Sequence, residues 1–354
     1  MIIPQIKYPS VTSPQQLIKT IKQWSLFGQI ALTEIDGKSI DDVKAILRKL
    51  GGTVDIFIES ESLDADGQLA LLNEGACGLL NRDSSLDTGI VPADRRMGLM
   101  DNPPLDQAIP SSTLVVLDSP SAARISELEM ARIDCLVDIV DLSPELITDF
   151  FNTVLVTDRP DGLWSTVIVD PIGIALGLAY SNYESLLHAI ETRCGTYWSR
   201  SRDDLWIKGE TSGATQQLLG IRMDCDRDCL RFTVTQDSPG FCHRNTHTCF
   251  GQERTIQSVV ERLQQRLAEA DENSFTYRLA NQPEMLEAKL LEEAKELSLA
   301  SQQSDQDEIA WEAADVLYFS LIAMLKNGVS LDRVYAELAR RMNRVVRRDP
   351  GIQS

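Results

Sequence analysis

The chain has 354 residues, 43% of them hydrophobic and 25% charged, and a formal net charge of −19. This length exceeds what a single hydrophobic core usually organises, so we expect a soluble globular protein of two or three domains. The acidic balance argues against binding to nucleic acid or to an anionic membrane surface. It leaves phosphorylated substrates open, because clustered carboxylates can hold divalent cations that in turn hold phosphates.

The sequence predicts a cytoplasmic protein. A basic start followed by a long apolar stretch is absent after Met1, and the longest membrane-like run, 316–325, is too short to cross a bilayer. The 7 cysteines are an odd number in a large chain without a signal sequence. Such cysteines are more typical of reduced thiols and metal ligands than of a disulfide framework.

Residues 1–150 alternate between strand-like and helix-like patterns, which predicts a small parallel α/β domain. The expected strands are 29–35, 53–59, 77–80, 113–117 and 135–140. The proline-rich stretch 91–110 is expected to be a loop. The domain resembles part of a phosphate-binding barrel, but no glycine-rich phosphate loop follows any of its strands. We therefore expect a structural or assembly role here.

Residues 151–254 combine strand patterns with one helical pattern, which predicts an α+β domain. The expected strands are 163–170, 218–228 and 229–236, and one helix is expected at 185–195. Residues 255–354 are almost wholly helical, with helix-period apolar positions at 255–272, 283–302, 307–327 and 331–348. Short connections between these helices predict a helical bundle. The predicted protein is thus multidomain: α/β, then α+β, then all-α.

The most specific chemistry lies in the α+β domain. If 218–228 is a strand, Asp224, Asp226 and Asp228 line one face, and Cys225 points through the other. Three adjacent carboxylates suit Mg²⁺. Three thiolates, from Cys225, Cys242 and Cys249, suit a zinc ion that keeps one position for water, which is the catalytic arrangement.

Composition and spacing leave simpler interpretations open. The acidic triplet could be a solvated strand face. Cys225 could be a small buried hydrophobe. Cys242 and Cys249 could instead bind a structural zinc together with Cys229 or His247.

Four segments resemble phosphoribosyl-AMP cyclohydrolase: YWSRSR at 197–202, LWIKGETSG at 205–213, DCDRD at 224–228, and CH…CF across 242–250. The resemblance covers roughly 154–251. It implies magnesium at Asp224, Asp226 and Asp228. It also implies a zinc site formed by Cys225, Cys242 and Cys249 from two subunits of a homodimer.

The resemblance also implies a reaction. Zinc-activated water opens the adenine ring of phosphoribosyl-AMP between N1 and C6. We assign proton transfer to His243, which could instead be only a hydrogen-bonded neighbour of the zinc. Hydroxyls, cations, aromatic rings and tight turns suited to substrate and phosphate binding are found at Trp198, Ser199, Arg200, Ser201, Arg202, Trp206, Lys208, Thr211, Ser212 and Gly213.

A second acidic cluster lies in the predicted helices. Lys289, Glu293 and Glu296 share one helix face, and Glu312 and Asp315 share a face of the next helix. Antiparallel packing would bring the four acids together, which is costly unless Mg²⁺ neutralises them. Such a site would grip a triphosphate and orient water, with Glu293 as a catalytic residue and Lys289 pairing with phosphate.

The alternative is a solvated, glutamate-rich surface with ion pairs. The apolar residues around Glu312 and Asp315 argue against it. These motifs, with Tyr277–Leu279, resemble phosphoribosyl-ATP pyrophosphohydrolase over about 255–348. Arg341 could add to phosphate binding, although a solvated helix end is the simpler interpretation.

Together the two resemblances imply a fungal-type bifunctional enzyme of histidine biosynthesis that binds the nucleotides phosphoribosyl-ATP and phosphoribosyl-AMP. Fungal enzymes of this kind often continue into a histidinol dehydrogenase domain, and we expect that activity to be absent here. The alternatives are a general nucleotide pyrophosphohydrolase with a structural or regulatory zinc domain, and a non-enzymatic scaffold held by structural zinc and helix dimerisation.

Overall fold

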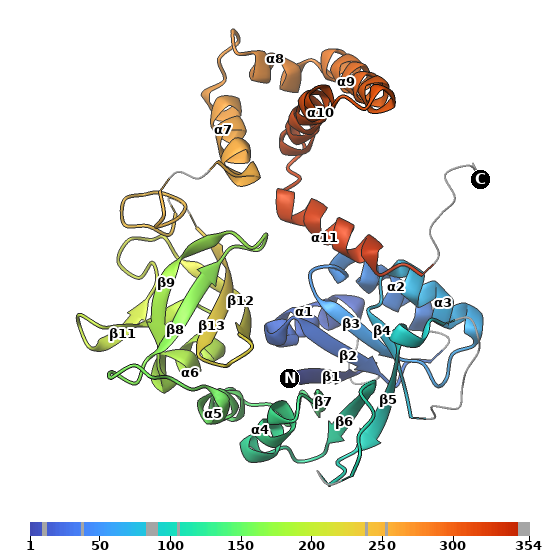
Figure 1. Ribbon diagram of the computed structural model, residues 1–354, viewed down its shortest axis with the longest axis vertical. Coiled ribbons are helices and arrows are strands. Elements are labelled where there is room, and N and C mark those ends of the chain that lie inside the picture. Colours follow the sequence, from blue (N-terminus) through green and yellow to red (C-terminus); the bar gives the residue numbers. More distant parts are fainter. Residues whose placement is uncertain are drawn as a thin grey trace. The chain divides into compact units, whose positions relative to one another are not determined.

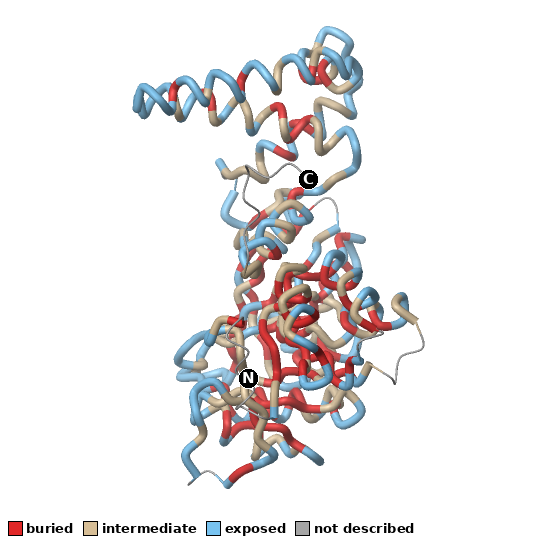
Figure 2. The backbone as a smooth tube through the Cα atoms, turned by 90° about the vertical axis from the view of Figure 1, so that its right-hand side faces the viewer, coloured by how far each residue is buried: buried red, intermediate tan, exposed pale blue. Residues whose placement is uncertain are grey.

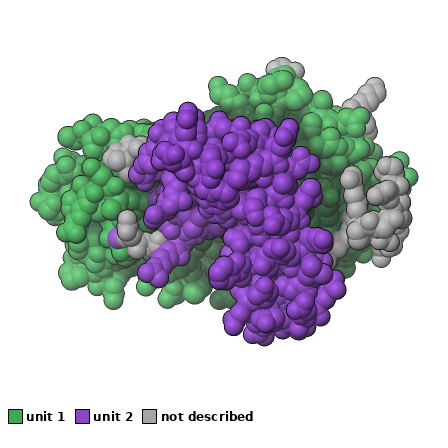
Figure 3. All heavy atoms as spheres, turned by 90° about the horizontal axis from the view of Figure 1, so that it is seen from above, with its two compact units in different colours: residues 1–250, 336–354 green, residues 251–335 purple. Residues whose placement is uncertain are grey.

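The computed structural model describes residues 1–8, 13–36, 39–82, 91–104, 107–237, 240–251 and 254–345. The chain forms two compact units, coloured separately in Figure 3. The first unit comprises residues 1–250 together with the residues from 336 onward, and the second comprises 251–335. In the part of the chain that is described, no helix combines the length and apolar character needed to span a bilayer.

Seven parallel strands of the first unit close into a barrel (Figure 1). They are β1 (Ile2–Lys7), β2 (Gln29–Thr33), β3 (Asp55–Glu59), β4 (Gly78–Asn81), β5 (Arg96–Asp101), β6 (Thr113–Leu117) and β7 (Cys135–Asp138). Pairing of β1 with both β2 and β7 closes the ring. Apolar side chains such as Ile3, Phe57 and Leu136 fill the interior, so the barrel encloses a packed core.

Most of the crossover connections between parallel barrel strands contain a helix. These helices are α1 (Pro14–Trp24), the short η2 (Ser25–Phe27), α2 (Ile40–Leu50), α3 (Ala65–Glu74), the short η4 (Ala93–Arg95) and α4 (Ala122–Met130). Helix α5 (Pro144–Val154) follows the last barrel strand and leads to the next sheet. Apolar faces of α1, α2 and α3 bury Leu17, Ile46 and Leu71 against the outer side of the barrel. The predicted parallel α/β architecture is therefore confirmed, and it closes on itself.

Two barrel strands escaped the sequence prediction. The stretch 91–110 is not a loop throughout, because β5 lies within it and pairs with β4 and β6. Its residues are only half-buried and contain no β-branched side chain, and prolines flank it. The first strand, β1, was not predicted at all. Its Pro4 is unusual in a strand, since proline cannot donate to the ladder.

A four-stranded sheet follows in the order β12-β13-β8-β9. Its strands are β8 (Trp164–Val169), β9 (Ala175–Ser181), β12 (Gln216–Met223) and β13 (Cys229–Gln236), accompanied by α6 (Tyr183–Thr192) and the hairpin of β10 (Thr196–Ser199) and β11 (Asp204–Ile207). Phe151 and Phe232 share one apolar core with Ile2 and Phe27 of the barrel. Figure 2 shows that many residues of the first unit are buried.

The second unit is helical, as predicted. It contains α7 (Ile256–Glu269), α8 (Phe275–Asn281), α9 (Pro283–Gln303), α10 (Gln306–Lys326) and the start of α11 (Leu331–Met342). The long helices α9 and α10 pack against each other. The seven-residue α8 was not predicted, and it contacts α10 through a 2.8 Å hydrogen bond between the hydroxyls of Thr276 and Tyr318.

The second half of α11, expected within the helical bundle, belongs to the first unit. The Arg340 side chain is buried, and its Nη1 donates to the backbone oxygen of Glu74 at 2.8 Å. Gly52 has φ +88°, and a Cβ there would lie 1.9 Å from the backbone oxygen of Ala336. A close backbone approach therefore joins α11 to the turn before β3. The predicted helix end at 348 lies outside the described residues.

Candidate active sites

The acidic triplet lies on a turn and not on a strand, so this part of the sequence prediction was wrong. Strand β12 ends at Met223 and β13 begins at Cys229, and the five residues between them form the hairpin connection. Arg227 in this turn has φ +65°, which a continuous strand would not allow. Cys225 consequently does not point through an opposite sheet face, and its Sγ lies 3.9 Å from Oδ1 of Asp226.

The turn nevertheless gathers the three carboxylates. One oxygen from each of Asp224, Asp226 and Asp228 lies within 4.8 Å of the others, and all three residues are exposed. Oδ1 of Asp224 accepts hydrogen bonds from the backbone N–H groups of Asp228 and Cys229, both at 3.1 Å, which fixes the turn. A hydrogen bond with Asp224 and the charges of Asp226 and Asp224 raise the pKa of Asp228. This mutual repulsion and the all-oxygen donor set fit a hard divalent cation.

Two of the three predicted zinc ligands lie together. Cys242 and Cys249 occupy the loop after β13, and burial together with the charge of Cys242 raises the pKa of the Cys249 thiol. The backbone N–H of Arg244 and the hydroxyl of Thr246 lower the pKa of Cys242. Cys225 is exposed, and within the described residues the three thiols do not form a three-ligand group. One chain therefore brings two soft ligands together and carries the third elsewhere.

Lys208 and His243 lie beside this thiol pair. Burial lowers the pKa of Lys208, and the neighbouring thiolates of Cys249 and Cys242 act in the opposite direction. The ammonium group lies 5.5 Å from the centre of the Phe241 ring. The Nδ1 atom of His243 lies 3.9 Å from Sγ of Cys242, and the imidazole is exposed. The residue predicted to transfer a proton, His243, and one residue predicted to bind phosphate, Lys208, thus both lie beside the thiol pair.

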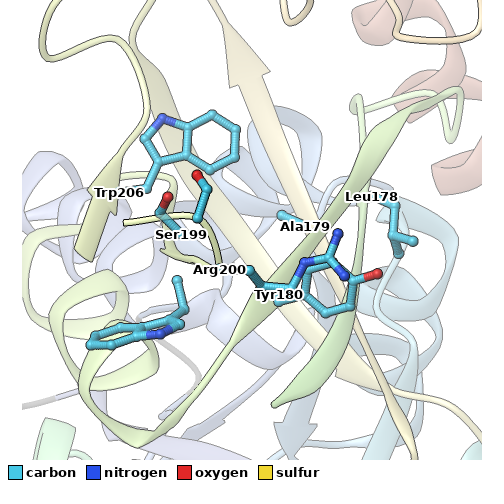
Figure 4. A pocket seen from close by; sticks show the side chains of 8 residues that line it. Leu178, Ala179, Tyr180, Ser199, Arg200 and Trp206 are labelled. Carbon is cyan, nitrogen blue, oxygen red and sulfur yellow. The ribbon is translucent and has the colours of Figure 1, made fainter. Parts of the chain in front are cut away.

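A pocket of about 420 Å³ opens between β9 and the β10–β11 hairpin (Figure 4). Its lining consists of Leu178, Ala179, Tyr180, Trp198, Ser199, Arg200, Ser201 and Trp206. Five of these were predicted to bind substrate: both tryptophans, both serines and the arginine. Aromatic walls, hydroxyls and a guanidinium group together suit a nucleotide, whose base can stack and whose phosphate can accept hydrogen bonds.

The remaining predicted substrate residues lie outside the pocket lining. Arg202 is exposed and donates from Nε to the Ser199 hydroxyl at 3.3 Å. Thr211, Ser212 and Gly213 form an exposed turn after β11, in which the Gly213 N–H donates to the backbone oxygen of Gly209 at 2.8 Å.

Sequence reasoning missed the β9 side of the pocket. Leu178, Ala179 and Tyr180 belong to a strand that was not predicted. Its sequence, ALGLAYS, is almost wholly apolar or small and lacks the apolar–polar alternation that identifies a half-buried strand. Nothing in the sequence shows that Tyr180 faces Trp198 and Trp206, because that depends on how the hairpin folds over the sheet.

The helical cluster also forms. One carboxylate oxygen from each of Glu293, Glu296 and Glu312 lies within 4.8 Å of the others. Glu293 and Glu312 are each only 7% exposed. Burial, followed by the charges of Glu296 and Glu293, raises the pKa of Glu312, and its Oε2 is buried without a hydrogen-bond partner. A buried carboxylate oxygen that lacks a donor, set among other acids, fits a divalent cation.

Two further predicted site residues lie near this cluster, and only one of them reaches it. Nζ of Lys289 is 2.7 Å from Glu292 and 3.5 Å from Glu293, so its ammonium group reaches the edge of the cluster. Asp315 lies one turn beyond Glu312 on α10, but it is not among the three acids that converge. Arg341 pairs with Glu337 at 2.7 Å, which favours the helix-end interpretation.

Comparisons with known proteins match both regions. The phosphoribosyl-AMP cyclohydrolase family matches residues 177–251, and the phosphoribosyl-ATP pyrophosphohydrolase family matches 256–342. The first segment contains the thiol pair, the aspartate turn and the whole pocket lining. The second contains the glutamate cluster. Residues 1–176 lie outside both matches.

Several curated proteins are similar to the chain. A histidine biosynthesis trifunctional protein of Kluyveromyces lactis is 36% identical over 323 residues, which are 89% of this chain and 38% of that protein. A histidine biosynthesis bifunctional protein of Schizosaccharomyces pombe is 45% identical over 54% of this chain and 45% of its own length. One from Bacillus subtilis is 36% identical over 52% of this chain and 94% of its own length.

Proposed function

The chain belongs to the family of histidine biosynthesis bifunctional proteins, and from this membership we propose that it catalyses two consecutive hydrolyses. The first converts phosphoribosyl-ATP to phosphoribosyl-AMP and pyrophosphate. The second opens the adenine ring of phosphoribosyl-AMP between N1 and C6. One observation carries the proposal: each of the two matched segments gathers its own set of metal-ligand side chains.

For the first reaction, Glu293, Glu296 and Glu312 would hold Mg²⁺, with Asp315 completing the set. Bound magnesium supplies neutralisation of the triphosphate charge and polarisation of the phosphorus that water attacks. Glu293 is well placed to orient that water, because it is buried between α9 and α10 and adjoins the other two glutamates. Lys289 would bind a phosphate oxygen once the substrate competes with Glu292 for its ammonium group.

For the second reaction, Cys242 and Cys249 of one chain and Cys225 of a second copy would hold zinc. Bound zinc supplies a water molecule of lowered pKa as nucleophile. His243, which lies beside Cys242, would transfer the proton as the ring opens, and buried Lys208 would add a positive charge next to the thiolates. The exposed aspartate turn would hold Mg²⁺ near the substrate phosphates.

Substrate binding would use the pocket beside β9. The rings of Trp198 and Trp206 can stack on the purine, and Ser199, Ser201 and Arg200 can bind a phosphate. Thr211, Ser212 and Gly213 would extend this surface through their hydroxyls and turn backbone. The shared zinc set makes a homodimer the expected assembly. The 7 cysteines are all free, which fits a reducing, cytoplasmic location.

The test supplies the purified chain with phosphoribosyl-ATP, Mg²⁺ and Zn²⁺ and follows phosphoribosyl-AMP and its ring-opened product by chromatography. Glu293→Gln should stop pyrophosphate release while phosphoribosyl-AMP supplied directly is still opened. Cys242→Ser should let phosphoribosyl-AMP accumulate. A parent protein that hydrolyses ordinary nucleoside triphosphates equally well, with Cys242→Ser behaving like the parent, would instead indicate a general nucleotide pyrophosphohydrolase.

A further inference from the structure

Two arginine guanidinium groups lie over the Tyr180 ring in the pocket wall. The Cζ atom of Arg200 lies 4.1 Å from the ring centre, and that of Arg159 lies 4.3 Å from it. Figure 4 shows Arg200 against the Tyr180 ring, with Ser199 and Trp206 across the pocket. A cation over an aromatic face is attracted by the ring quadrupole, so this single ring holds both arginines.

The two arginines differ in how their charge is compensated. Arg159 makes a bidentate pair with Asp161, through Nε at 3.0 Å and Nη2 at 2.6 Å. Its backbone is fixed as well, because Arg159 N–H donates to the Thr157 hydroxyl at 3.2 Å. Arg200 is exposed and, among the residues described, forms no ion pair. The charge of Arg159 is therefore paired with that of Asp161, whereas no described acid pairs with Arg200.

This difference matters for binding an anion. A long exposed arginine loses side-chain entropy when it grips a phosphate, and prior stacking on a fixed ring removes part of that cost. Compensation of Arg159 by Asp161 also limits the repulsion between two cations on one ring. The arrangement holds Arg200 in place beside the hydroxyls of Ser199 and Ser201.

We propose that Tyr180 is a positioning residue that holds the Arg200 guanidinium for the phosphate of a purine nucleotide in this pocket, and that Arg159, which also lies over the Tyr180 ring, positions that ring. The proposal rests on the proposed function for its substrate class. Arg159 precedes residues 177–251, the segment that matches the cyclohydrolase family, so this support comes from the connection between α5 and β8. The pocket volume of about 420 Å³ lies in the range of small-molecule sites.

The test measures binding of AMP and of adenosine to the full chain by calorimetry at fixed salt. Tyr180→Leu and Arg159→Leu should each weaken AMP binding by about three- to tenfold and leave adenosine binding unchanged, because only AMP carries the phosphate. Tyr180→Phe keeps the aromatic face and should bind AMP like the parent. Arg159→Lys should recover part of the loss. In turnover of phosphoribosyl-AMP, both leucine variants should raise KM and leave kcat unchanged.

Arg231→Leu is the matched control, since Arg231 is exposed on β13 of the same sheet and does not line the pocket. Equal weakening of AMP and adenosine, or a Tyr180→Phe variant as damaged as Tyr180→Leu, would overturn the proposal. So would leucine variants that bind AMP like the parent. A parent that lacks ring-opening activity but reproduces the AMP–adenosine difference would refute the proposed function alone.

Discussion

Each of the two acidic clusters brings three carboxylates that repel one another close together, but one cluster is exposed and the other is largely buried. Asp224, Asp226 and Asp228 come from one short turn and are exposed to water, which screens their repulsion. Glu293 and Glu312 face each other from two helices and are each 7% exposed, so water screens them poorly. If both clusters bind a cation, as proposed, the buried helical cluster should depend on it far more than the exposed turn does, and substitutions should separate the two.

The largest effect is expected for Glu312→Gln. The amide cannot replace an anionic ligand, so metal binding should be lost and pyrophosphate release should fall by about 100-fold or more. Ring opening of supplied phosphoribosyl-AMP should stay at the parent rate. The measurement is the initial rate of each step at saturating Mg²⁺. Glu287→Gln, at an exposed position of α9 outside the three converging acids, is the control and should change neither rate.

A smaller effect is expected for Asp226→Asn. In an exposed turn, water can take the place of one carboxylate oxygen, so ring opening should slow by about tenfold and recover partly as Mg²⁺ is raised. A magnesium titration of the ring-opening rate measures this. Asp141→Asn removes one charge from an exposed position outside the turn and should leave the titration unchanged. A loss as complete as that of Glu312→Gln would erase the distinction between the clusters.

How far these clusters could be predicted from the sequence depends on their local geometry. The helical period places Glu293 and Glu296 on one face, and antiparallel packing of the next helix was needed to bring Glu312 opposite. Both long helices form close to their expected limits. For the aspartates, the period of two was applied to a segment that is a turn. Their proximity was predicted correctly for the wrong reason, because a tight five-residue connection also gathers its side chains.

The remaining features of the fold could not be predicted from the sequence, because they depend on contacts between residues far apart in the chain. Closure of the barrel needs β1 to pair with β7, and no local pattern reports that pairing. The half-buried β5 has no clear alternation, since neither of its faces is fully buried. Tyr180 likewise gains its role only when the β10–β11 hairpin lies against β9. Such contacts depend on residues far apart in the chain.

A third, more modest effect concerns stability without metal. The raised pKa of Glu312 means that the folded state binds its proton more tightly than the unfolded state. Stability of the helical unit in a chelator should therefore rise as pH falls through the folded-state pKa, and decline as pH increases. Glu312→Gln should flatten this slope and raise the metal-free Tm at neutral pH. Calorimetry in chelator across pH ~5 to 8 measures both.

The same experiment on Asp226→Asn tests the other side of the comparison. Repulsion in the turn also raises the pKa of Asp228, so its contribution has the same sign. Because these carboxylates are exposed, screening should make the change in slope smaller than for Glu312→Gln. Equal slopes for the two variants would mean that burial does not distinguish the clusters.

The smallest effect is expected for Lys289→Met. The helical cluster includes a cation at its edge, 3.5 Å from Glu293, whereas no described lysine or arginine forms an ion pair with the aspartate turn. If Lys289 binds a substrate phosphate, its loss should raise KM for phosphoribosyl-ATP by about three- to tenfold and leave kcat unchanged. Lys295→Met on the same helix is the control. A fall in kcat without a change in KM would instead mean that Lys289 positions the Glu293 carboxylate. In that case the ammonium group would act on a proposed metal ligand of the helical cluster and not on the substrate phosphate.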